Sequence, residues 1–130
     1  MTNDRPILLA VDDEPDILDF LERVFRKEYT VQRADDAAQA LARLETGPVQ
    51  LVVTDQRMPG MSGLELLERV AVDHPDTTRV LLSGFSDLPE ITEAAEVGLV
   101  HAYVVKPVDS TRLREAVTEA VARCEAGDWT

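Results

Sequence analysis

The sequence predicts an α/β protein in which five parallel strands form one doubly wound (βα)5 sheet with helices on both faces. Short apolar runs alternate with amphipathic segments five times along the chain. Such alternation, with short connections and right-handed crossovers, is typical of a parallel sheet. The length of 130 residues corresponds to one domain, which is large enough to bury a core.

The expected strands are the apolar runs themselves. Four of them lack polar alternation, as strands covered on both faces do. The remaining run, residues 29–34, alternates apolar and polar side chains and is typical of a half-exposed edge strand. In chain order the five runs are residues 7–11, 29–34, 51–53, 80–82 and 102–105.

The segments between the runs have the apolar spacing of helices and carry helix-start signals. Pro15 suits the first turn of the first helix. Ser62 and Glu65 have capping-box spacing, and Asp87 with Glu90 is expected to open a short fourth helix. The fifth helix has the clearest buried stripe, formed by Leu113, Ala116, Val117, Ala120, Val121 and Cys124.

Composition excludes several classes of function. The chain has 13 basic and 25 acidic residues, a formal charge of −12, which disfavours binding to nucleic acid or to an anionic membrane. Cys124 is the one cysteine, so an intrachain disulfide and a zinc site built on several cysteines are excluded. The chain shows neither a signal peptide nor a membrane-spanning run, so a cytoplasmic location is expected.

Polar groups follow each of the four buried strands. Asp12 and Asp13 follow the first, Asp55 the third, Ser83 the fourth and Lys106 the fifth. Open parallel sheets bind ligands at this edge, where the strand order reverses. In the flavodoxin-like order 2-1-3-4-5 the reversal lies between the first and third strands, so the three acids are expected to meet there.

Three carboxylates at one place need a proton or a cation between them. Two carboxylates about 4 Å apart repel by ~4 kcal/mol at an effective dielectric constant near 20. Oxygen ligands of this kind suit Mg²⁺, whose coordination a phosphate often completes. An added ammonium from Lys106 and a hydroxyl from Ser83 complete a set suited to phosphoryl transfer, with Asp55 as the nucleophile.

Four stretches carry a family resemblance: VDDEP at 11–15, TDQRMPGMSG at 54–63, LSG at 82–84 and YVVKP at 103–107. In this order and spacing they resemble the receiver domain of two-component response regulators, chemotaxis-type receivers among them. The resemblance covers residues 6–124, which we take as the domain, with residues 1–5 and 125–130 as tails.

The resemblance implies that Asp55 accepts a phosphoryl group from a histidine kinase or a histidine phosphotransfer protein. Asp13, Asp55 and the backbone carbonyl of Arg57 would bind Mg²⁺ (Mn²⁺ is the alternative ion), and Asp12 would reach it through water. The domain would be a self-catalysed phospho-acceptor with slow autodephosphorylation and not a turnover enzyme.

The resemblance also implies a switch. Ser83 would move to the phosphoryl group, Tyr103 would turn inward, and Lys106 would bind phosphate through a cis Lys106–Pro107 peptide. The switched surface would be the fourth helix, fifth strand and fifth helix, acting on an output domain or effector; a phosphorylation-dependent homodimer is left open. The bulky Phe85, two residues after Ser83, is expected to slow attack by water on the phosphoryl group.

Other interpretations of these residues remain. Asp12 and Asp13 could cap a helix, and Tyr103 could be a static core aromatic. A dehalogenase-like phosphatase would need an acid two residues after Asp55, where Arg57 stands. A flavin carrier would need a Ser-, Thr- and Gly-rich first loop, whereas residues 12–16 are mostly acidic. A pseudo-receiver would have lost an acid or the lysine.

Overall fold

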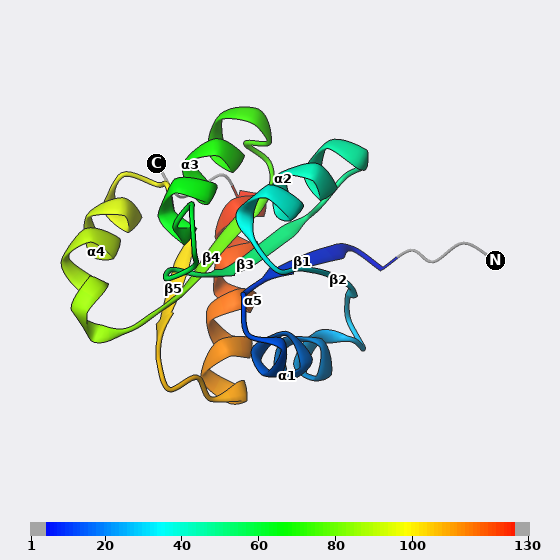
Figure 1. The fold of residues 1–130 in the computed structure, drawn as a ribbon, viewed down its shortest axis with the longest axis horizontal. Coiled ribbons are helices and arrows are strands. Elements are labelled where there is room, and N and C mark those ends of the chain that lie inside the picture. The colour runs from blue at the N-terminus through cyan, green and yellow to red at the C-terminus, as the bar shows by residue number, and fades with distance from the viewer. Residues whose placement is uncertain (1–4, 127–130) are drawn as a thin grey trace.

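The computed structural model describes residues 5–126. It contains one parallel sheet of five strands in the order β2-β1-β3-β4-β5, which confirms the predicted topology (Figure 1). β1 pairs with both β2 and β3, so the order reverses between β1 and β3. The strands are β1 (Ile7–Val11), β2 (Thr30–Ala34), β3 (Leu51–Asp55), β4 (Thr78–Ser83) and β5 (Ala102–Val105).

Helices cover both faces of the sheet. Helices α1 and α5 pack on one face, and α2, α3 and α4 pack on the other (Figure 1). A short 3₁₀ turn, η1 (Phe85–Asp87), precedes α4. The helices are α1 (Pro15–Phe25), α2 (Ala37–Thr46), α3 (Gly63–Asp73), α4 (Leu88–Glu96) and α5 (Ser110–Ala126).

Alternate side chains of each central strand enter opposite cores. In β1, Leu8 and Ala10 join the core under α1 and α5, whereas Leu9 and Val11 join the core under α2, α3 and α4. This two-sided burial explains why the central strands read as continuous apolar runs. It also leaves the ends of these strands, and not their faces, open for polar chemistry.

The capping box predicted at α3 is present and complete, formed by Ser62 and Glu65. At the start of α2 the Asp36 carboxylate accepts the Gln39 N–H. Asp87 directly precedes α4, as expected, and occupies its N-cap position. Its carboxylate makes no capping hydrogen bond to α4, and both of its oxygens accept from the Arg57 guanidinium instead.

Some boundaries differ from the expected ones. β3 continues through Thr54 and Asp55, which pair with Leu81 and Leu82 of β4. Helix α5 continues to Ala126, and so includes the first part of the expected tail, whereas residues 1–4 and 127–130 lie outside the described residues. None of the helices described is both long enough and apolar enough to span a membrane.

Candidate functional site

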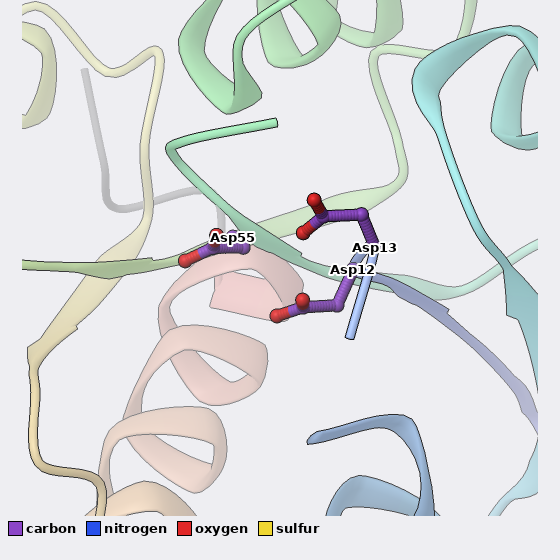
Figure 2. Close-up of side chains that lie close together, drawn as sticks. All are labelled: Asp12, Asp13 and Asp55. Carbon is purple, nitrogen blue, oxygen red and sulfur yellow. The ribbon is translucent and has the colours of Figure 1, made fainter. Parts of the chain in front are cut away.

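The three acids meet where β1 and β3 end. Asp12 and Asp13 directly follow β1, and Asp55 is the last residue of β3. Each offers an oxygen, and these oxygens all lie within 4.8 Å of one another, with the carboxylates gathered between the two strand ends (Figure 2). Asp12 and Asp55 are buried and Asp13 is exposed. The site is therefore a buried acidic floor with one rim carboxylate open to water.

Asp12 has an oxygen that the described residues leave unsatisfied. Its Oδ1 accepts the Glu14 N–H at 2.9 Å, but its buried Oδ2 has no hydrogen-bond partner among the residues described. Burial, reinforced by the charges of Asp55 and Asp13, raises the pKa of Asp12 to about 6. An orphaned oxygen beside two more carboxylates fits a hard divalent cation such as Mg²⁺ or Mn²⁺.

Lys106 brings a cation to this floor from the end of β5. Its Nζ lies 2.6 Å from Asp55 Oδ1, and its backbone N–H donates to the Ser83 carbonyl at 2.7 Å. Burial alone lowers the pKa of Lys106, but the hydrogen bond and charge of Asp55 outweigh it and raise the pKa overall. The Lys106–Pro107 peptide is cis, as the resemblance implied. Lys106 is therefore held as an ammonium against Asp55.

The two residues expected to form the switch lie on the neighbouring strands. Ser83 is buried at the end of β4, and its Oγ donates to the Gly84 carbonyl at 2.8 Å. Tyr103 is half-buried in β5, opposite Leu81 of β4. It packs against the core under α2, α3 and α4, so a packing role is established for its ring and the switch role stays a prediction.

Comparison with known proteins decides the family. The family model described as "Response regulator receiver domain" matches residues 8–118. The chain belongs to this family. Receiver domains are signalling domains of two-component systems, in which histidine kinases phosphorylate response regulators and many of these regulators carry output domains.

Two curated relatives differ in length. The hydrogenase transcriptional regulatory protein HoxA of Cupriavidus necator is 33% identical over 93% of this chain, which spans only 25% of HoxA. Sporulation initiation phosphotransferase F of Bacillus subtilis is 33% identical over 90% of this chain and 93% of the relative. The receiver thus resembles both a fused regulatory domain and a protein of nearly its own size.

Solved structures support the fold. The signal receiver domain of an HD domain-containing protein from Pseudomonas fluorescens has a TM-score of 0.85 and 35% identity, covering 98% of this chain and 94% of its own. The response regulator TrrA of Thermotoga maritima, in complex with Mg²⁺ and BeF, has a TM-score of 0.77 and 30% identity, covering 88% and 98%.

Sequence reasoning missed the residues that position the loop after Asp55, residues 56–62, which we call the acceptor loop after the role expected of Asp55. The Gln56 N–H donates to the Leu82 carbonyl at 3.0 Å, its side chain accepts the Leu64 N–H at 2.8 Å, and its carbonyl accepts the Gly63 N–H at 2.9 Å. A Cβ on Gly63 would lie 2.3 Å from the carbonyl oxygen of Asp55. Glycine has a low intrinsic helix propensity, and its place directly after the Ser62 cap was the available signal.

An ion pair between two loops was also missed. Arg57, two residues after Asp55, contacts Asp87 before α4, with Nη2 3.0 Å from Oδ1 and Nε 3.3 Å from Oδ2. The Arg57 side chain is 74% exposed and that of Asp87 only 10%. The two residues are far apart in the sequence, so no local pattern indicated the contact.

Proposed function

We propose that this receiver accepts a phosphoryl group on Asp55 from a phosphohistidine donor, a histidine kinase or histidine phosphotransfer protein, in the presence of Mg²⁺. One observation carries the proposal. Three carboxylates whose oxygens lie within 4.8 Å of one another share a site with an ammonium 2.6 Å from Asp55. A cation-binding floor, a carboxylate nucleophile and a phosphate-binding lysine are together suited to phosphoryl transfer. We take residues 6–124 as the receiver and the cytoplasm as its location.

In the transfer, a carboxylate oxygen of Asp55 attacks phosphorus, and the bond between phosphorus and the donor's imidazole nitrogen breaks. The nitrogen keeps the bonding electrons and leaves as imidazole after taking up a proton. The divalent ion, when bound, offsets the charge of the acids and of a phosphoryl oxygen. Asp13, Asp55 and the Arg57 carbonyl would hold it, and Asp12 would act through water. Lys106 neutralises a second phosphoryl oxygen.

The acyl phosphate would then change the receiver's surface. The Ser83 hydroxyl, which donates to the Gly84 carbonyl, would instead donate to a phosphoryl oxygen, and Tyr103 would turn inward. These movements bias two arrangements of α4, β5 and α5, the surface that would control an output domain or effector. Slow autodephosphorylation would end the signal.

The test is intact-mass measurement after incubation with acetyl phosphate and Mg²⁺. We expect one added phosphoryl group, absent when EDTA is added and absent in Asp55→Asn. The matched control is Asp36→Asn, which alters an acid that caps α2 and is not one of the three clustered carboxylates; it should be labelled like the unaltered protein. Labelling that persists in Asp55→Asn would place the acceptor elsewhere and refute the proposal.

A further inference from the structure

The contact between Arg57 and Asp87 joins the loop after β3 to the turn before α4. Two guanidinium nitrogens donate to the two oxygens of one carboxylate, at 3.0 and 3.3 Å. Such a two-point contact fixes geometry as well as charge. Nη2 also lies 3.4 Å from Ser86 Oγ, so the guanidinium holds the turn at two successive residues.

The pair restrains one of its partners more than the other. Asp87 is the buried partner. Among the described residues, Arg57 is the one whose side chain donates hydrogen bonds to the Asp87 carboxylate. A buried carboxylate that loses its partner keeps the cost of its lost hydration, whereas an exposed guanidinium is simply rehydrated. The pair therefore holds the turn of Asp87 to the acceptor loop.

This turn is continuous with the proposed switch. The Gly84 carbonyl accepts both the Ser83 hydroxyl, at 2.8 Å, and the Asp87 N–H, at 3.3 Å. When the Ser83 hydroxyl moves away from the Gly84 carbonyl, it therefore leaves an oxygen that still accepts a hydrogen bond from the Asp87 N–H. Fixing Asp87 fixes the surroundings of the Ser83 hydroxyl in the arrangement described here.

We infer that the Arg57–Asp87 ion pair is a latch that holds the segment between β4 and α4 in its unphosphorylated arrangement and opposes the movement of Ser83. The inference rests on the proposed function. In it Arg57 is a positioning residue, acting through Asp87 and not on the phosphoryl group. Breaking the pair then makes the switched arrangement easier to reach.

The test uses beryllofluoride with Mg²⁺, the pair of components present in the TrrA complex, as a substitute for the phosphoryl group. It is titrated into the full chain while backbone amide signals of residues 83–87 are followed by NMR. We expect Arg57→Gln and Asp87→Asn each to lower the half-saturating concentration about threefold, the scale of a partly exposed ion pair. The double variant should match the single variants, since either substitution already breaks the contact.

Two control variants on α3 carry the same charge changes. Arg69→Gln and Glu68→Gln alter exposed side chains, and both should keep the half-saturating concentration of the unaltered protein. If one of the two single variants proves unstable, the other tests the latch alone. A shift in the controls equal to that in the latch variants would attribute the effect to net charge and overturn the inference.

The remaining outcomes separate the two proposals. If the unaltered protein does not respond to beryllofluoride, the proposed function fails. If it responds but the latch variants bind no more tightly, the latch is wrong. Weaker binding by Arg57→Gln together with tighter binding by Asp87→Asn would make Arg57 a ligand of the phosphoryl substitute. Additive effects in the double variant would show that the two side chains act separately, and either result overturns the latch.

Discussion

Replacing Asp12 by asparagine should stabilise the metal-free receiver. Asp12 is fully buried, and its Oδ2 has no hydrogen-bond partner among the described residues. Its ionised form is therefore unfavourable in the folded protein unless a cation is bound. Asparagine keeps the shape and keeps an oxygen to accept the Glu14 N–H, the bond that Asp12 Oδ1 makes at 2.9 Å.

The magnitude follows from the pKa of Asp12. Its rise from 3.8 to about 6 corresponds to about 3 kcal/mol of destabilisation by the ionised form at neutral pH. The new amide group offsets part of the gain, because a buried donor without a partner costs about 1 to 2 kcal/mol. We therefore expect Asp12→Asn to raise the free energy of unfolding by about 1 to 2 kcal/mol at neutral pH.

The pH dependence has a definite sign. The folded protein binds a proton at Asp12 more tightly than the unfolded chain does, so the stability contributed by Asp12 is greatest below pH 3.8 and is lost as pH rises through about 6. Asp12→Asn lacks this dependence. Its advantage over the unaltered protein should therefore be larger at neutral pH than at mildly acidic pH.

The assay is urea unfolding in EDTA at neutral pH and at mildly acidic pH, monitored by circular dichroism. Asp13→Asn is the matched control and should change stability less, because Asp13 is exposed. Saturating Mg²⁺ should stabilise the unaltered protein more than Asp12→Asn, since an ion that binds the folded state adds stability according to its affinity. A variant that is no more stable in EDTA, or whose advantage does not change with pH, would refute the reasoning.

Two further predictions concern the loops beside Asp55. Gly63→Ala should lower the free energy of unfolding by about 3 kcal/mol and slow phosphorylation by acetyl phosphate, because its Cβ would lie 2.3 Å from the Asp55 carbonyl oxygen. The control is Gly47→Ala, whose Cβ would meet open space. It should change the free energy of unfolding by less than about 0.5 kcal/mol in the same urea assay. Phe85→Ala should leave stability within about 0.5 kcal/mol, because the side chain is 74% exposed. It should also shorten the lifetime of the phosphorylated form about twofold or more, measured as loss of the added mass, by admitting water; an unchanged lifetime would contradict the shielding role of Phe85.

The topology could be predicted because burial on both faces leaves a plain record in the sequence. The run at residues 7–11 matches β1, and the alternating run at residues 29–34 contains the edge strand β2, which begins one residue later, at Thr30. The end of β3 was underestimated because Thr54 and Asp55 are polar although they remain in the ladder beside β4. The strand prediction depends on an unbroken apolar run, and the polar residues that bring a carboxylate to the sheet edge interrupt that run.

The acids and Lys106 could be predicted as neighbours because parallel strands deliver their final residues to one edge. The hydrogen-bond partners of Gln56 and Arg57 could not be predicted from the sequence. Gln56 satisfies the N-terminus of α3 through a side chain with no local sequence signature. Asp87 looked like a capping residue because it precedes a helix, but the distant guanidinium provides two charge-assisted bonds where capping offers one or two neutral donors.

The hydrogen bond from the Gly63 N–H to the Gln56 carbonyl closes residues 56–63 into a ring of fixed circumference. An inserted residue would have to break that closure or push the first turn of α3 away from the strand that carries Asp55. Engineers who wish to give this protein a new signalling specificity should therefore exchange the exposed side chain of Pro59 and keep Gly60, whose φ of +81° favours glycine. Lengthened loops belong at the opposite end of the sheet.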